Sequence, residues 1–247
     1  MWGLVFALIR AGTRPATNKG NPMYFLLALI VLCVIYMLYK RRTTPISPPG
    51  NTGIYMEMNR RLSDLLEKAA DFQKSNRLDE AENAYNEILK IRRLQARDNL
   101  AHQIDIAITL NTLGNLYSDN HKYDLAEGAY AEALDIYRQR TDDNPAWLSY
   151  VGRTLNNYAT LCSLTRQIDR AEKFGSESVE ILRKCRNENP DRYGNDFAKT
   201  LLVLAHVLTC QKDKEASALA LAKEAELMAT AKDLQLKARK MIDKLKR

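Results

Sequence analysis

The feature that most restricts the fold of this chain is an internal period of about 45 residues. A small residue marks the same place in each of four copies, at Ala69, Gly114, Ala159 and Ala205. A second small residue follows at Ala81, Ala126 and Ala171, and near Ala216 in the last copy. Aromatic residues accompany both places in the first two copies, as Phe72, Tyr117, Tyr85 and Tyr130. Small residues let two helices cross closely and aromatic side chains fill the space beside the crossing, so each copy predicts a pair of packed helices.

The composition agrees with an all-α fold. Only 10 glycines and 7 prolines occur in 247 residues, no strand-like alternation is visible, and good helix formers are abundant. The pairs Asn144-Pro145 and Asn189-Pro190 separate copies, because proline suits the start of a helix and not its interior. We expect helices over residues 54–75, 78–97, 101–119, 123–140, 146–166, 168–187, 192–211, 213–228 and 231–246.

The segment Thr109–Tyr117, followed by Ala126, Tyr130 and Ala133, resembles a tetratricopeptide helix pair. The usual period of that family is roughly 34 residues. The extra residues here amount to about three helical turns, which lengthens each helix without rotating its packing face. The segment Leu155–Ala159 resembles the long, kinesin-light-chain type of repeat. The resemblance implies a right-handed α-solenoid of about four helix pairs, at 54–98, 99–143, 144–189 and 190–230, closed by a capping helix at 231–247.

A membrane anchor is predicted before the repeats. Residues 23–39 contain no charge and reach about 25 Å as a helix, slightly short of a hydrocarbon core of about 30 Å. Residues 1–22 form a tail, or Met23 is the true start, and 40–53 form a basic, proline-rich linker. A cleaved signal peptide and a buried core helix are the alternatives, but no small-residue cleavage site follows and the run is apolar on all sides.

The three contiguous bases Lys40, Arg41 and Arg42 favour a cytoplasmic location for the chain after the span.

Residues 1–53 hold six bases and no acid, and residues 232–247 hold seven bases against two acids, so the net charge of +7 leaves −4 for the body. Nucleic-acid binding along the solenoid is therefore not expected. The four cysteines include no CxxC pair, so we expect them to be reduced thiols.

No catalytic or cofactor motif is present. The sequence has no glycine-rich phosphate loop, no GxSxG and no HExxH, and its three histidines lie far apart, so we expect neither an enzyme nor a metal or cofactor site.

Function is expected on the concave face of the solenoid. The resemblance implies that first helices line this groove at fixed offsets from the small contact residue, which gives Asn111, Asn115, Ser118, Asn156, Thr160, Ser163 and His206, with Leu202, Thr209, Leu66, Ala70 and Gln73 at the remaining offsets. Asparagine can donate and accept, so such a row can hold the backbone of a peptide. The alternative is that these asparagines bond neighbouring helices. Of the residues that clamp chaperone carboxylates in some members, only Asn115 is matched, which disfavours that ligand.

These features together predict a membrane-anchored scaffold that binds a protein partner in its groove. They do not indicate an oligomeric state. Two alternatives remain at the level of sequence. One is a receptor or assembly factor for an organelle-import or membrane complex. The other is a tether to anionic lipid through the basic last helix, whose polar side carries Lys237, Arg239, Lys240, Lys244 and Lys246.

Overall fold

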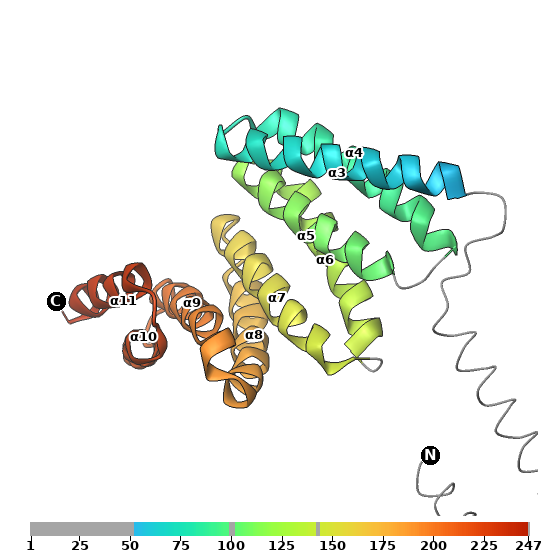
Figure 1. Ribbon diagram of the computed structural model, residues 1–247. Coiled ribbons are helices and arrows are strands. Elements are labelled where there is room, and N and C mark those ends of the chain that lie inside the picture. Colours follow the sequence, from blue (N-terminus) through green and yellow to red (C-terminus); the bar gives the residue numbers. More distant parts are fainter. Residues whose placement is uncertain (1–51, 99–101, 142–143, 247) are drawn as a thin grey trace, which may run out of the picture. The chain divides into compact units, whose positions relative to one another are not determined.

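The computed structural model describes residues 52–98, 102–141 and 144–246 (Figure 1). Within these ranges the chain forms nine α-helices, one short 3-10 helix and no strand. The helices belong to one compact unit, Pro48–Arg247. The tail, the predicted span at 23–39 and the linker up to residue 51 lie outside the described residues. Among the helices that are described, none is both long and apolar enough to cross a membrane.

The helices form four consecutive pairs and one final helix. Their bounds are α3 Thr52–Lys74 with α4 Leu78–Asp98, α5 Gln103–Asp119 with α6 Tyr123–Thr141, α7 Leu148–Leu164 with α8 Ile168–Glu188, α9 Pro190–Thr209 with α10 Glu215–Met228, and α11 Lys232–Leu245. The 3-10 helix η2, Pro145–Trp147, precedes α7. Each end lies within about two residues of the expected one. Every helix packs on the next, and α7 also contacts α5 and α9, while α9 contacts α11. The first helices of the later pairs therefore form one layer.

The small residues of the period lie where the two helices of a pair cross. Ala69, Ala81, Ala126, Ala159, Ala171 and Ala205 are fully buried. Gly114 is also buried, and a Cβ built on it would lie 2.5 Å from Cε1 of Tyr130. No side chain fits at that distance, so the second aromatic of the repeat fills the space that the glycine leaves. At the crossing of α5 and α6, Gly114 therefore packs directly against the ring of Tyr130.

Each pair turns between its helices on a residue in the left-handed backbone region. The four are Asn76, His121, Arg166 and Asp213, with φ between 55° and 63°. In the first three turns the backbone N–H after this residue bonds back into the first helix, as in Lys122 N to Tyr117 O at 2.8 Å. This is the six-to-one bond of a Schellman ending. The fourth connection is two residues longer than the others, and the buried small residue of α10 is Ala218, while Ala216, near which it was expected, is exposed.

Ion pairs join successive second helices at the period of the repeat. Arg93 of α4 pairs with Glu132 of α6 at 2.7 Å, and Arg138 of α6 pairs with Glu177 of α8 at 2.6 Å. Arg183 of α8 pairs with Glu224 of α10 in the same way. These side chains are largely exposed, and each such pair contributes about 0.2–1 kcal/mol. Their regular recurrence shows that the charges of neighbouring repeats are matched.

The last helix covers the fourth pair with an apolar side that agrees in part with the expected one. The sequence suggested Leu234, Ala238, Met241 and Leu245 as its apolar side. The structure buries Leu234, Ala238 and Ile242, which follow the helical spacing of four residues. Met241 and Leu245 are only partly buried at the edge of this contact. Two apolar side chains are thereby left beside the open surface of the first-helix layer.

Candidate functional site

The predicted groove residues all lie on the layer of first helices. Asn111, Asn115 and Ser118 belong to α5, Asn156, Thr160 and Ser163 belong to α7, and His206 belongs to α9. Asn115, Thr160 and His206 are exposed, and the other four are partly buried. Because α7 packs against both α5 and α9, these side chains share one face of the protein.

The asparagines also make hydrogen bonds within the protein. Oδ1 of Asn115 accepts from the hydroxyl of Tyr130 at 2.7 Å. Oδ1 of Asn111 accepts from Nδ2 of Asn157 at 3.3 Å, so α5 and α7 are joined through Asn157 and not through its neighbour Asn156. Among the described residues, the buried Oδ1 of Asn156 has no partner. The first two asparagines therefore bond neighbouring helices, as the alternative interpretation suggested, and their amide groups also remain on the groove face.

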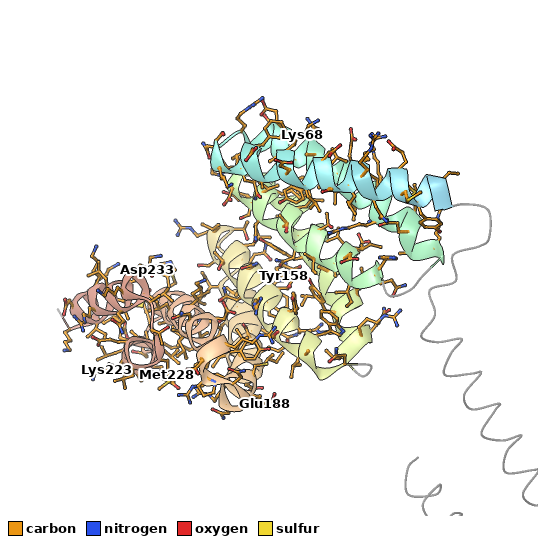
Figure 2. All side chains as sticks on the ribbon, viewed as in Figure 1. Lys68, Tyr158, Glu188, Lys223, Met228 and Asp233 are labelled. Atoms are coloured by element: carbon orange, nitrogen blue, oxygen red, sulfur yellow. The ribbon has the colours of Figure 1, made fainter. Side chains whose placement is uncertain are left out.

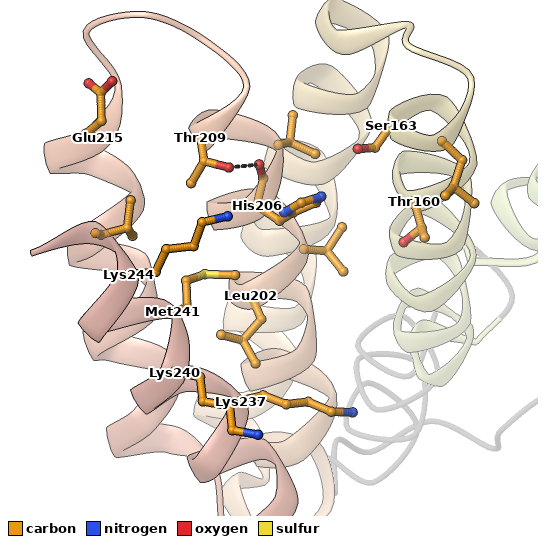
Figure 3. Close-up of a pocket in the computed structure, with 14 residues that line it drawn as sticks. Thr160, Ser163, Leu202, His206, Thr209, Glu215, Lys237, Lys240, Met241 and Lys244 are labelled. Carbon is orange, nitrogen blue, oxygen red and sulfur yellow. Dashed lines mark hydrogen bonds between the residues drawn. The ribbon is translucent and has the colours of Figure 1, made fainter. Parts of the chain in front are cut away.

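A cavity of about 760 Å³ opens on the same face near the C-terminal end (Figure 3). It is lined by Thr160, Ser163 and Leu164 of α7, by Leu202, Val203, His206, Val207 and Thr209 of α9, by Glu215 of α10 and by Lys237, Lys240, Met241, Lys244 and Leu245 of α11. Three of the seven predicted groove residues line it. The other four, Asn111, Asn115, Ser118 and Asn156, do not.

The apolar lining comes from three helices. Leu202 and Val207 are buried in α9, whereas Met241 and Leu245 of α11 are partly buried. Leu164 lines the side formed by α7 and is 56% exposed. A cavity of this size that presents apolar surface beside polar side chains has the dimensions of a ligand-binding site.

The polar lining is strongly basic. Lys237, Lys240 and Lys244 lie along the rim formed by α11, and Figure 3 shows Lys244 extending toward α9. Lys237 has only a 4.0 Å contact with Asp233, and across the described residues Lys240 and Lys244 have no ion pair. Glu215 is the one acidic residue among those that line the cavity. The charge of this site therefore favours a negatively charged ligand.

Two lysines elsewhere on this protein, Lys122 and Lys214, are paired across repeats. Nζ of Lys122 lies 2.7 Å from Glu82, and Nζ of Lys214 lies 2.6 Å from Glu172. The hydrogen bonds from Lys214 and Gln211 lower the pKa of the Glu172 carboxyl. The unpaired lysines of α11 differ from these by their position at the cavity.

A third polar group, formed by Glu127, Tyr158 and Arg170, supports the fold. Nη2 of Arg170 donates to Oε1 of Glu127 at 2.7 Å and lowers the pKa of that carboxyl, and the Tyr158 hydroxyl donates to the same oxygen at 3.0 Å. Burial and this contact raise the pKa of Tyr158 to about 12. The guanidinium also stacks over the Tyr158 ring, which Figure 2 labels at the middle of the layer. These three side chains bond to one another and so join α6, α7 and α8.

The cysteines and the metal-ligating residues give no second site in the described ranges. Burial raises the pKa of the Cys162 and Cys185 thiols, which keeps both protonated at neutral pH, and Cys210 is exposed. No group of three or more His, Cys, Asp or Glu in the described part of the chain could hold a metal ion.

Residues 105–184 match the family model of the tetratricopeptide repeat. This stretch is therefore similar to tetratricopeptide repeats, and it covers less than half of the chain. The match covers nearly all of α5–α8, the two pairs in which the small and aromatic pattern is clearest. Tetratricopeptide repeats generally serve as scaffolds for interactions between proteins. The basic cavity lies mostly beyond this stretch, on α9 and α11.

Several solved structures are similar to this chain. BtubC (BKLC) from P. vanneervenii shares 21% identity with a TM-score of 0.47, and the match covers 72% of this chain and 61% of BtubC. Two structures from Podosopora anserina, with nearly identical TPR-like repeats of the kinesin-light-chain kind, share 17% identity with TM-scores of 0.46. Those matches cover 75% of this chain and 93% of each structure. No curated protein matches the chain.

Proposed function

We propose that this protein is a membrane-anchored scaffold that binds a protein partner on the face formed by α5, α7, α9 and α11. The observation that carries the proposal is the cavity of about 760 Å³, which joins side chains of the first helices α7 and α9 with those of α11 on the predicted groove face. Leu164, Lys240 and Lys244 are exposed along this cavity. Surfaces that combine apolar and unpaired charged groups are typical of binding sites.

The membrane half of the proposal rests on the sequence. Residues 23–39 are uncharged, and Lys40–Arg42 follow directly, so the repeats are proposed to face the cytoplasm. The linker that follows contains three prolines, which favour an extended backbone of about 3.1 Å per residue. Such a spacer holds the binding face away from the bilayer and within reach of a soluble partner.

Two experiments on the full-length chain test the proposal. Carbonate extraction tests the membrane anchor, and co-purification of bound proteins tests partner binding. Carbonate extraction should leave the chain in the membrane fraction, and recovery in the soluble fraction would contradict the anchor. The variant Ser163→Trp fills the cavity, whereas Glu180→Trp adds the same bulk to the exposed surface of α8. We expect the first variant to lose the proteins that purify with the wild type and the second to retain them. Equal recovery of those proteins by both variants would contradict binding on this face.

A further inference from the structure

We propose that the cavity between α7, α9 and α11 receives an acidic amphipathic helix of the protein partner. This inference rests on the proposed function and adds the chemistry of the segment that is bound. The starting point is charge. Successive repeats match their charges, as Arg93 with Glu132 and Arg138 with Glu177 show. Other exposed lysines, such as Lys223 and Lys246, also have no ion pair among the described residues, but Lys240 and Lys244 border the cavity, whose lining contains only one acidic residue, Glu215. A ligand with carboxylates supplies the missing partners.

The apolar lining adds a second requirement. Met241 and Leu245 lie four residues apart on α11, so they form a continuous strip, and Leu202 lies opposite on α9. A ligand made only of acidic residues would leave this strip exposed to water or would bury carboxylates against it. The segment must therefore carry apolar side chains as well as acidic ones.

The arrangement of the two requirements favours a helix over an extended peptide. Lys240 precedes Met241 and Lys244 precedes Leu245, so the basic row and the apolar strip are adjacent on α11, about 100° apart. On an extended chain, successive side chains point to opposite faces. On a helix, an acidic stripe can border an apolar stripe at the same angle.

The length of the basic row supports the same occupant. Lys237, Lys240 and Lys244 have the spacing i, i+3, i+7 and span roughly 10 Å of α11. A partner helix that lies alongside α11 presents side chains of one face at the same spacing, so about two of its turns can pair with the whole row. Helices bind in apolar grooves in this way through anchors spaced over one face.

A peptide-display selection tests the proposal. A random library of roughly 16-residue peptides is selected against residues 48–247, the compact unit that contains all the described helices. We expect enriched peptides to be negatively charged, to carry apolar residues with helical spacing, and to gain helical circular dichroism on binding. The double variant Lys240→Ala/Lys244→Ala should weaken them by roughly 3- to 30-fold. The matched variant Lys223→Ala/Lys246→Ala, which removes two exposed lysines outside the cavity, should have little effect.

Other results would overturn the proposal in distinguishable ways. Enriched peptides that are neutral or basic, that bind in an extended form, or that respond equally to both double variants contradict an acidic helix in this cavity. If such peptides lose affinity instead with Asn111→Ala/Asn156→Ala, the proposed function stands and only the further inference fails. If no peptide is enriched and phosphatidylserine vesicles recruit the unit through Lys240 and Lys244, a membrane is the ligand and both proposals fail. A selection that enriches nothing, with no vesicle binding, also rejects both.

Discussion

The hydroxyl of Tyr130 donates a hydrogen bond to Oδ1 of Asn115 at 2.7 Å. Tyr130 is only 2% exposed, whereas Asn115 is exposed on the groove face. A residue expected to serve partner binding thus also satisfies a polar group of the core. A side chain that only lines a groove could be removed with little effect on the fold, but this contact gives Asn115 a structural role as well.

We predict that Asn115→Ala destabilises the protein by about 1–3 kcal/mol, because the buried hydroxyl of Tyr130 loses its acceptor. Adding Tyr130→Phe should recover much of this loss, since the hydroxyl that lacks a partner is then removed as well. Urea unfolding followed by circular dichroism gives the free energy of unfolding of the wild type, the two single variants and the double variant, which form a double-mutant cycle. An Asn115→Ala variant as stable as the wild type would show that water replaces the amide without cost.

Gly114 and Gly128 should respond in opposite directions to the same substitution. A Cβ at Gly114 would lie 2.5–2.9 Å from three ring atoms of Tyr130, and that ring also packs against Tyr158. We expect Gly114→Ala to destabilise the protein by about 1–3 kcal/mol through overpacking. A Cβ at Gly128 meets nothing within 4 Å, so Gly128→Ala should stabilise α6 by roughly 0.5–1 kcal/mol. Thermal unfolding of both variants checks the signs, and shifts of equal sign would contradict this packing.

The turn residue Arg166 offers a stabilising change. Its φ of 62° is costly for a residue with a Cβ, roughly 1–2 kcal/mol, and its side chain is exposed. Arg166→Gly should raise the melting temperature, with part of the gain offset by the greater freedom of glycine in the unfolded chain. Asn76→Gly should raise it less, because asparagine tolerates this backbone region. A lower melting temperature for Arg166→Gly would mean that the arginine makes a contact worth more than the strain.

Glu172 should contribute to the acid sensitivity of the fold. Its folded pKa is lowered by hydrogen bonds from Lys214 and Gln211, so the stability that it adds is present above its unfolded pKa of about 4.3 and is lost as the pH falls below that value. Glu172→Gln should therefore cost more stability at pH 7 than at pH 3. Denaturant unfolding at both values measures this, with the exposed Glu180→Gln as the control. The same cost at both values would contradict a shifted pKa.

Much of the fold could be predicted from the sequence because the period is encoded by residue size. The small residues at 69, 114 and 159 fix where helices cross, and proline with asparagine fixes where pairs begin. Asn189 shows this directly, since its side chain accepts from the N–H of Arg192 at the start of α9. The crossing residue of the last copy, expected near Ala216, is Ala218, because the connection between α9 and α10 has five residues instead of three.

The cavity was harder to predict, because it depends on how α11 is rotated against α9. The sequence placed Met241 on the apolar side of α11, and the structure buries Ile242 more deeply and leaves Met241 partly buried at the cavity. Lysines on the exposed side of a capping helix look like ordinary solvated residues until their neighbours are known. The signal that could have identified them was the succession of lysine and apolar residue at 240–241 and again at 244–245.

The central claim, that a protein partner binds the face of the first helices, is tested most directly by site-specific photo-crosslinking in the full-length chain. A photoreactive amino acid is placed at Ser163, which lines the cavity, or at Glu180, which is exposed on α8 (Figure 3 labels Ser163). After irradiation of intact membranes, we expect a discrete protein adduct from position 163 that is absent from position 180. Adducts from position 180 alone, or the same adducts from both positions, would contradict binding on this face.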